Sequence, residues 1–314
     1  MREKLLVIVG PTAVGKSKIA LKIAKRFNGE IISGDSIQVY RGLDIGTAKI
    51  TTAEMQGIRH HLIDIHDPDY YYSVAEFQRS AKQLITEINQ RGCLPIIVGG
   101  TGLYIKAITE NYNLPELTAD LKLREELSKL SKEELYNQLC QHDPVTAKRL
   151  HPNDQKRIIR ALEVYHQLGK PISQLIAEQQ TSRENELSYD QLIIGLDLKR
   201  QLLYERINKR VESMIEQGLV SEVESLKFAG YDEKYNSMQG IGYKEVLRHL
   251  AGESTLAEAV VMVQQATRNF AKRQLSLFRA NDSINWFDLT EYHEKHDETI
   301  LDTIYSLIAK RFQP

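Results

Sequence analysis

The sequence contains very little cysteine. Cys93 and Cys140 are the only cysteines among 314 residues, and they are too few and too far apart for a disulfide framework or a four-ligand zinc site. Disulfide frameworks belong to oxidising compartments, whereas free thiols are the rule in the cytosol. We therefore expect a protein that works in the reducing cytoplasm.

Long apolar runs and an excess of one charge sign are also lacking. The apolar run nearest the N-terminus, Leu5 to Val9, is shorter than the core of a signal peptide and far short of a membrane span. The formal charge is −1, from 41 Lys and Arg against 42 Asp and Glu, which excludes a globally basic nucleic-acid binder. We expect no membrane association, and any nucleic-acid site must come from local clusters of basic residues.

Residues 10–17 match the phosphate-loop pattern G-x-x-x-x-G-K-[ST] at every defined position. Backbone N–H groups between the two glycines can surround an anion, and the start of the following helix adds its positive dipole end. The pattern predicts a diphosphate or triphosphate site formed by Gly10, Pro11, Thr12, Ala13, Val14, Gly15, Lys16 and Ser17. The Ser17 hydroxyl would face Mg²⁺. A glycine turn that carries a lysine by chance is the alternative, which the strand, loop and helix context disfavours.

Strand and helix patterns alternate around this loop. Strands are predicted over residues 5–9, 30–33, 60–65 and 94–98, and helices over residues 18–27 and 74–91. The last of these strands is apolar throughout, as a buried parallel strand should be. The order predicts an α/β fold, a phosphate-loop NTPase-like parallel sheet flanked by helices. Asp35 would then follow the carboxyl end of a strand, where open α/β sheets bind ligands.

Strand patterns vanish between about residues 118 and 180, where polar breaks at residues 143–144, 151–152 and 169–171 separate charged helical stretches. We expect an inserted all-helical domain over residues 118–185, between core segments 1–117 and 186–314. The second core segment is expected to be mostly helical. Its predicted elements are strands over residues 191–197 and 284–289 and helices over residues 198–217, 255–280 and 291–312.

The surroundings of the phosphate loop leave more than one function open. A phosphate-loop NTPase needs a second acid at the end of an apolar strand, but the strand over residues 94–98 ends in Gly-Gly-Thr-Gly. Asp35 is the only acid well placed near the loop. Nucleoside-type kinases can carry an acid there, so a small-molecule or nucleoside kinase is one possibility.

Other features favour a larger, anionic substrate. Residues 35–49 form a long polar and aromatic loop, and basic residues gather in clusters: Lys156, Arg157 and Arg160; Arg206, Lys209 and Arg210; Arg268, Lys272, Arg273 and Arg279. Each cluster alone is more often a solvated helix face, but several on one phosphate-loop protein favour an anionic polymer. A phosphate-loop protein that binds RNA without catalysis is a third possibility.

Several stretches resemble one family, the tRNA dimethylallyltransferases, also called tRNA isopentenyltransferases. The stretches are Gly10–Ser17, Asp35–Lys49, His60–Asp64, Val98–Tyr104, His151–Asp154 with Arg157–Tyr165, Gly240–Lys244 and Ala271–Gln274. Enzymes of this family transfer a dimethylallyl group from its diphosphate to the exocyclic N6 amine of the adenosine just 3′ of the anticodon, and they release pyrophosphate. The resemblance implies that the loop holds a leaving group. No water is activated, which accounts for the missing second acid.

The resemblance also implies roles for single residues. Lys16 and the loop amides would hold the diphosphate, Ser17 would face Mg²⁺, and Arg210 would clamp the phosphates. Asp35 would be the general base, since the adenine amine becomes acidic as its bond to carbon forms. Thr101 would hydrogen-bond near the departing oxygen, and the cations would stabilise the negative charge that develops on pyrophosphate.

The implied partners are dimethylallyl diphosphate and the anticodon stem-loop of tRNA, bound by a chain that we expect to be monomeric. The family's tRNA contacts map onto Asp35, Ser36, Ile37, Gln38, Thr101, Arg124, Lys156, Arg157, Ile158, Ile159 and Arg160. The stretch over residues 239–244 is a weaker candidate. By their own pattern Ile158 and Ile159 are packing residues, and Arg124 alone would be an ordinary surface charge.

Overall fold

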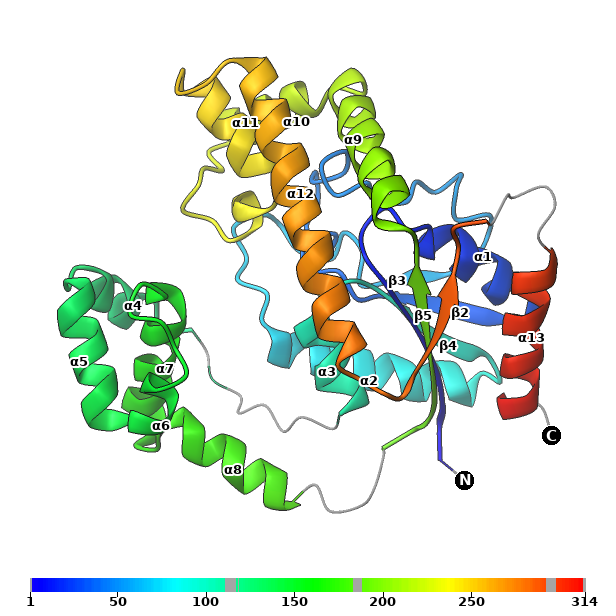
Figure 1. Ribbon diagram of the computed structural model, residues 1–314, viewed down its shortest axis with the longest axis horizontal. Coiled ribbons are helices and arrows are strands. Elements are labelled where there is room, and N and C mark those ends of the chain that lie inside the picture. The colour runs from blue at the N-terminus through cyan, green and yellow to red at the C-terminus, as the bar shows by residue number, and fades with distance from the viewer. Residues whose placement is uncertain (1, 111–116, 118, 183–187, 292–297, 313–314) are drawn as a thin grey trace. The chain divides into compact units, whose positions relative to one another are not determined.

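The computed structural model describes residues 2–110, 117, 119–182, 188–291 and 298–312 (Figure 1). The chain divides into two compact units. The core unit comprises residues 1–110 and 187–314, and the helical unit comprises residues 111–186. Across the described ranges, no helix has the length and apolar character that crossing a membrane requires.

The core unit is built on a parallel sheet of six strands in the order β3-β2-β4-β1-β5-β6. The strands are β1 (Lys4–Val9), β2 (Gly29–Ser33), β3 (His60–His61), β4 (Leu94–Val98), β5 (Asp190–Asp197) and β6 (Ile284–Asp288). This confirms the predicted α/β fold and places the strand before the phosphate loop inside the sheet, between β4 and β5. Because the strands are parallel, the turns that follow them share one edge, where ligands bind in such sheets.

The predicted strand over residues 60–65 is wrong in length. Only His60 and His61 pair with β2. Leu62 and Asp64 have positive φ angles of 60° and 55°, and left-handed backbone cannot continue an extended strand. The chain turns there instead and forms a single bridge between residues 40 and 66.

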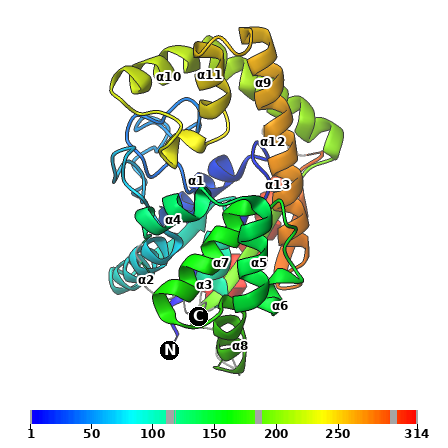
Figure 2. The same ribbon diagram turned by 90° about the vertical axis from the view of Figure 1, so that its left-hand side faces the viewer.

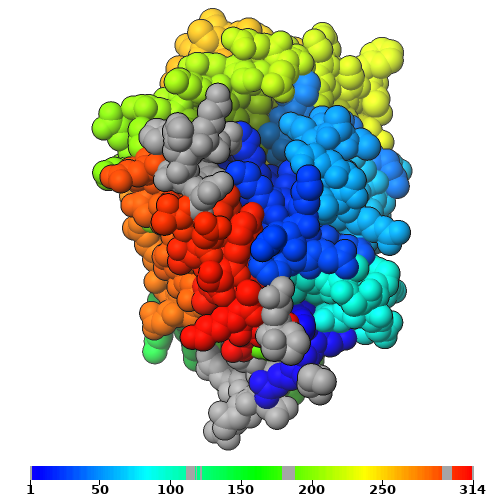
Figure 3. Space-filling model, turned by 90° about the vertical axis from the view of Figure 1, so that its right-hand side faces the viewer, coloured from blue at the N-terminus to red at the C-terminus, as the bar shows by residue number. Residues whose placement is uncertain are grey.

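Helices cover both faces of the sheet. They are α1 (Lys16–Arg26), α2 (Val74–Gln90), α3 (Gly102–Thr109) and α13 (Glu298–Phe312). Neighbouring residues of β1 point to opposite faces, so Leu5 packs in the core with α2 and α3, and Leu6 packs in the core with α1 and α13. Figure 3 shows α13, in red, beside the blue N-terminal segment, where the rings of Phe27 and Tyr305 meet edge to face.

The remaining helices of the core unit gather about one long helix (Figures 1 and 2). They are α9 (Arg200–Glu216), α10 (Leu219–Phe228), η1 (Ser237–Gln239), α11 (Tyr243–Leu250) and α12 (Leu256–Arg279). Helix α12 contacts α3, α9 and α11, and α10 contacts α9 and α11. The predicted helices over residues 198–217 and 255–280 and the predicted strands β5 and β6 are thus confirmed, with small differences at their ends. Of the predicted helix over residues 291–312, Glu291 lies in a turn, residues 292–297 lie outside the described ranges, and the helix is present from Glu298.

The helical unit has a small apolar core of its own. Its helices are α4 (Leu121–Ser128), α5 (Lys132–His142), α6 (Pro144–Ala147), α7 (Gln155–Leu168) and α8 (Ile172–Ser182). Leu135 of α5 and Ile158 of α7 are fully buried in that core. The side chains of Ser131, Asp143 and Asp154 cap the starts of α5, α6 and α7. Gly169, with left-handed backbone, ends α7, so the polar breaks in the sequence lie between helices.

Candidate functional site

The phosphate loop follows β1, and glycine shapes its backbone. Gly10 has a φ angle of 147°, and a Cβ there would lie 2.5 Å from the carbonyl oxygen of Leu196 on β5. Gly15, with a φ angle of 110°, turns the chain into α1. Both positions favour glycine because another residue would clash or be strained. The loop thus presents the N-terminus of α1, which is a geometry that binds phosphate groups.

Two cations belong to this loop site. Lys16 Nζ donates to the carbonyl oxygens of Gly10 at 2.9 Å and Pro11 at 2.8 Å. Burial of the ammonium and the nearby charge of Arg210 lower the pKa of Lys16 to about 7, against an opposite effect of Asp35. Burial also lowers the pKa of Arg210, again against the effect of Asp35. Two desolvated cations that repel each other are stabilised by an anion that contacts both, which fits a diphosphate.

A close backbone contact brings Asp35 and Thr101 together. The turn after β2 contains Gly34 and the turn after β4 contains Gly99, and a Cβ on Gly99 would lie 2.4 Å from the carbonyl oxygen of Gly34. Across this contact the Ser36 N–H donates to Thr101 Oγ1 at 3.2 Å. Glycine is therefore required here so that the two turns can touch.

The carboxylate of Asp35 is oriented by its own loop. Its Oδ1 accepts hydrogen bonds from the N–H groups of Ile37 at 2.9 Å and Gln38 at 3.4 Å. These bonds fix the plane of the carboxylate and engage only one of its two oxygens. A carboxylate held in this way can accept a proton at the other oxygen.

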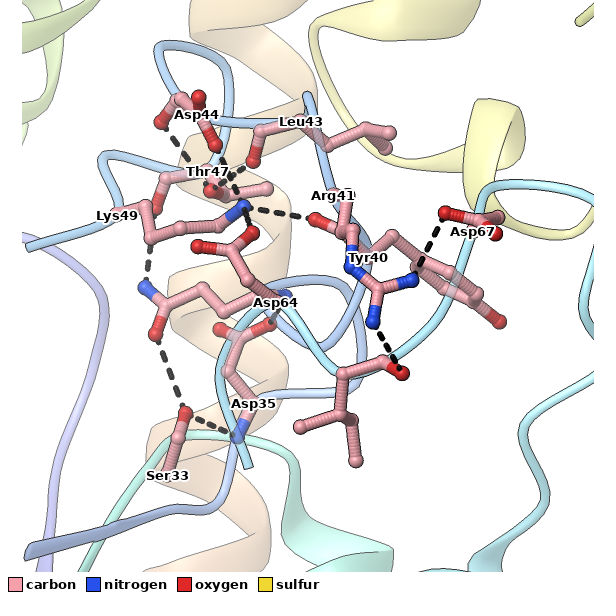
Figure 4. A network of polar contacts seen from close by, with 12 residues as sticks. Ser33, Asp35, Tyr40, Arg41, Leu43, Asp44, Thr47, Lys49, Asp64 and Asp67 are labelled. Atoms are coloured by element: carbon pink, nitrogen blue, oxygen red, sulfur yellow. Dashed lines mark hydrogen bonds and ion pairs between the residues drawn. The ribbon is translucent and has the colours of Figure 1, made fainter. Parts of the chain in front are cut away.

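Polar contacts close the loop over residues 35–49, as Figure 4 shows. Lys49 Nζ donates to the carboxylates of Asp44 at 2.6 Å and Asp64 at 2.5 Å and to the Tyr40 carbonyl at 2.7 Å. Its side chain is only 4% exposed. A buried ammonium with this many acceptors ties the end of the loop to its middle and to the turn at Asp64.

The carbonyl of Thr47 joins this loop to helix α9. It accepts from Gln38 Nε2 at 3.3 Å and from Arg210 Nη2 at 3.4 Å. Gln38 in turn accepts from the Ser33 hydroxyl at 3.2 Å (Figure 4). The position of the Thr47 carbonyl therefore affects Gln38, whose N–H contacts Asp35. It also affects the cation of the site, Arg210.

Two cavities adjoin at these groups. The first, of about 750 Å³, is lined by the phosphate loop. The second, of about 350 Å³, is lined by Ser36, Ile37 and Thr101 and by the stretch over residues 239–241 with apolar side chains of α9. The residues that line both cavities are Thr12, Asp35, Thr47, Arg210 and Phe270. The candidate base and the candidate phosphate clamp therefore stand where the two cavities meet.

The structure gives Arg124 and Arg160 of the helical unit a common partner. Arg124 Nε and Nη2 donate to Glu163 at 2.9 and 3.0 Å, and Arg160 Nη1 donates at 2.6 Å. The Glu163 side chain has no exposed surface. Burial raises its pKa, but the hydrogen bonds from both arginines lower the pKa of Glu163 overall. Arg124 is thus not an ordinary surface charge, because it also compensates a buried carboxylate.

The neighbouring predicted contacts on α7 divide into exposed and buried residues. Lys156 and Arg157 are exposed, and Arg157 pairs with Asp154, the N-cap of the helix. Ile158 has no exposed surface and Ile159 packs against the same core. The side chain of Ile158 therefore offers no surface to RNA, which agrees with its interpretation as a packing residue, and an RNA contact at this position stays a prediction.

Parts of the other basic clusters brace the core unit. Arg268 on α12 donates to Asn208 on α9 at 2.6 Å, and Arg279 donates to Asp197 at the end of β5 at 2.5 Å. Arg210 alone of these lines both cavities with Asp35. The three basic clusters therefore do not share one role.

Sequence reasoning assigned no role to Gln274, which bridges two turns of the site. Its Oε1 accepts from the Thr12 N–H at 2.8 Å, and its Nε2 donates to the Gly100 carbonyl at 2.9 Å. Gln274 lies on the buried stripe of α12 with Ala271 and Phe278. A polar residue inside an apolar helical stripe is the pattern that would have indicated it.

These features define a class: an α/β protein whose phosphate loop after β1 shares a cavity with an acid that follows β2, two strands away, with no acid at the end of β4. Comparison with known proteins narrows the class. Residues 38–281 match the family model for IPP transferase. The chain is 50% identical to the tRNA dimethylallyltransferase of Carboxydothermus hydrogenoformans over 96% of this chain and 97% of that one. It is 47% identical to the tRNA dimethylallyltransferase of Caldanaerobacter subterraneus over 100% of both chains. The chain therefore belongs to the IPP transferase family, which confirms the resemblance.

Solved structures agree with this assignment. The tRNA isopentenylpyrophosphate transferase of Bacillus halodurans superposes with a TM-score of 0.73 at 45% identity, over 99% of this chain and 97% of that chain. A eukaryotic dimethylallyltransferase acting on tRNA gives a TM-score of 0.81 at 30% identity, over 98% of this chain and 80% of that chain.

Proposed function

We propose that this protein is a tRNA prenyltransferase. It moves the dimethylallyl group of dimethylallyl diphosphate to the exocyclic N6 amine of the adenosine next to the anticodon on its 3′ side. The observation that carries the proposal is the junction of the two cavities, where Asp35 and Arg210 stand between the phosphate loop and a second, partly apolar space. A site that opens into both cavities suits two substrates that react where the cavities meet.

The reaction divides between these groups. The bond from the amine nitrogen to the allylic carbon forms as the bond from that carbon to the diphosphate oxygen breaks, and pyrophosphate leaves. The nitrogen becomes acidic as its bond forms, and Asp35 takes the proton. Lys16 and Arg210 stabilise the negative charge on the leaving group, which is where preorganised electrostatic stabilisation is strongest. Thr101, whose Oγ1 accepts from the Ser36 N–H, donates a hydrogen bond toward the departing oxygen and keeps its proton.

The residues present fit a magnesium ion that is held largely by the substrate. Mg²⁺ keeps several waters and takes one or two protein ligands together with phosphate oxygens. Ser17, the second residue of α1, lines the first cavity with Asp35, so its hydroxyl would supply a protein ligand. In the described ranges no three His, Cys, Asp or Glu side chains form a metal site by themselves. When bound, Mg²⁺ would neutralise charge on the diphosphate.

The second cavity would receive the adenosine. A base inside a stacked anticodon loop cannot reach the junction, so it must leave the stack, as bases do for other enzymes that act on their edges. Ser36, Ile37 and Thr101 line this cavity and would contact the base. Exposed Lys156 and Arg157 of the helical unit would contact phosphates of the tRNA. A monomeric state and a cytoplasmic location stay part of this proposal.

A kinase is disfavoured because β4 runs into glycines and Thr101 without the second acid of that class. The test is mass spectrometry of unmodified tRNA after incubation with the protein, Mg²⁺ and dimethylallyl diphosphate. We expect a mass gain of one dimethylallyl group at the adenosine beside the anticodon. Binding of tRNA without product would support a binding protein instead. ATP or GTP turnover that survives repurification and disappears in Lys16→Ala would support a kinase.

A further inference from the structure

Glu222 on α10 holds the 35–49 loop in addition to Lys49. Its Oε2 accepts from the N–H groups of Asp44 at 3.1 Å and Ile45 at 2.8 Å, and its Oε1 accepts from the Gly46 N–H at 3.2 Å. The hydroxyl of Tyr243 donates to the same Oε1 at 2.6 Å. One carboxylate thus engages three consecutive backbone amides and a phenol, which is an arrangement of charge-assisted hydrogen bonds.

The surroundings of Glu222 show that this contact is built into the fold. Leu219, Val223 and Leu226 of α10 are buried, and Glu222 stands among them at helical spacing. Burial and the nearby charge of Glu222 raise the pKa of Tyr243, which keeps the phenol protonated as a donor. A charged residue on an apolar stripe is costly unless its partners are fixed. Here the partners are the amides of the loop.

Gly46 carries the effect of this contact toward the reaction centre. A Cβ on Gly46 would lie 2.5 Å from the ring of Tyr243, so the loop lies directly against the phenol that Glu222 holds. The next residue is Thr47, whose carbonyl accepts from Gln38 and Arg210. The contacts of Glu222 therefore fix Gly46, the residue before Thr47. The Thr47 carbonyl in turn holds Gln38 and Arg210.

We propose that Glu222 is a positioning residue for the prenyl-transfer reaction. It acts through residues 44–47 to place the Thr47 carbonyl, and through it Gln38 and Arg210, around Asp35. The kinetic consequence rests on the proposed function, whereas the positioning itself does not. A carboxylate that merely stabilised the fold would change the unfolding temperature and the active fraction, but not the rate of each correctly folded molecule.

The test compares variants at Glu222 with a matched control on the same helix. Glu222→Ala removes all four acceptor contacts. Glu222→Gln keeps the shape but cannot accept from all four donors, because its Nε2 is itself a donor. Glu224→Gln changes the same residue type at an exposed position of α10 and serves as the control. The first readout is hydrogen exchange at the amides of residues 44–46, which requires no catalytic activity.

We expect exchange at these amides to speed up in Glu222→Gln and further in Glu222→Ala, with no change in Glu224→Gln. We also expect the single-turnover rate per titrated active site, at saturating substrates, to fall by about tenfold in Glu222→Gln. In Glu222→Ala it should fall by about 10²-fold, the scale of a 1 Å misplacement.

The outcomes separate the inference from the proposed function. Unchanged exchange in Glu222→Ala overturns the inference whatever the enzyme does. Faster exchange with an unchanged single-turnover rate per active site also overturns it, since the loop would then be held without consequence for the reaction. If the wild type and Glu224→Gln make no prenylated tRNA, the proposed function fails while the exchange result still decides whether Glu222 holds the loop.

Discussion

The phosphate loop and the 35–49 loop line the same cavity but are held by different means. Backbone conformation shapes the phosphate loop, through Gly10 and Gly15 and the start of α1. Side chains hold the 35–49 loop, through Lys49 within it and Glu222 from far along the chain. A site held by backbone can be recognised from a few consecutive letters of sequence. A site held by distant side chains becomes visible only when the chain is folded.

The largest expected effect tests whether the 35–49 loop supplies the base. Asp35→Asn keeps size and an acceptor oxygen but cannot take the proton, so the single-turnover rate should fall by about 10²- to 10⁴-fold. Binding of tRNA and dimethylallyl diphosphate should change little. The rate should be measured at saturating substrates over a series of Mg²⁺ concentrations. A rate restored by extra Mg²⁺, or one within a few-fold of wild type, would remove Asp35 from the role of base.

A pair of glycine substitutions sharpens the comparison between the two loops. Gly10→Ala places a Cβ against the Leu196 carbonyl, and Gly46→Ala places one against the ring of Tyr243, both at 2.5 Å. We expect Gly10→Ala to lower affinity for inorganic pyrophosphate by about 10²-fold, because neither the backbone at residue 10 nor the Leu196 carbonyl can move away. Gly46→Ala should instead lower the single-turnover rate by a similar factor. Calorimetry and rapid-quench kinetics on both variants check this, and the same defect in both would show that the loops do not act separately.

Exposed Lys156 and Arg157 of the helical unit should have a smaller effect, on tRNA binding. Replacing Lys156 and Arg157 by Ala should weaken tRNA binding by about tenfold at moderate salt. It should also reduce the slope of log affinity against log salt by about 0.7 to 0.9 for each lost phosphate contact. Arg160 is left in place because it pairs with buried Glu163. Lys148→Ala with Arg149→Ala, exposed in the same unit, is the control. An equal salt slope in both double variants would mean that Lys156 and Arg157 are only solvated.

The smallest effect concerns Lys16, the lysine of the phosphate loop. The pKa of Lys16, about 7 in the folded protein, lies below the ordinary lysine value of 10.5, so between these pH values the folded state binds fewer protons than the unfolded state. Stability of the free protein should therefore rise with pH across that window, relative to Lys16→Met, which lacks the titrating group. Binding of pyrophosphate should raise the pKa of Lys16 again. The affinity for pyrophosphate should therefore fall by less than tenfold per pH unit as the pH rises above 7. Thermal unfolding and calorimetry from pH 7 to 9 measure both, and parallel curves for wild type and Lys16→Met would contradict the shift.

Much of the fold follows from local pattern. The strands β1 and β4 and the helices α2, α9 and α12 stand where periodicity places them, because each has a stripe or run of apolar residues. The third strand is shorter than predicted because Leu62 and Asp64 leave the extended region, which no apolar pattern reveals.

The site divides in the same way. The sequence predicts Lys16 from a motif and Asp35 from its place after a strand, and the family resemblance brings in Thr101 and the roles of Asp35 and Arg210. The structure then places Asp35 and Arg210 together on both cavities. Glu222 and Gln274 could not be predicted from local sequence, because most of their hydrogen-bond partners are backbone groups far away in the chain. Each still breaks an apolar helical stripe, so a polar residue in such a stripe is the pattern to look for.

Gln274 also limits how this site could be redesigned. One amide must accept from Thr12 and donate to Gly100 at the same time, and a Cβ on Gly100 would lie 2.0 Å from its nitrogen. Glu would turn the donor into an acceptor against a carbonyl, Leu would leave both backbone groups unpaired, and Asn is one methylene too short. Position 274 therefore admits a single amino acid, so a library that randomises it should return glutamine.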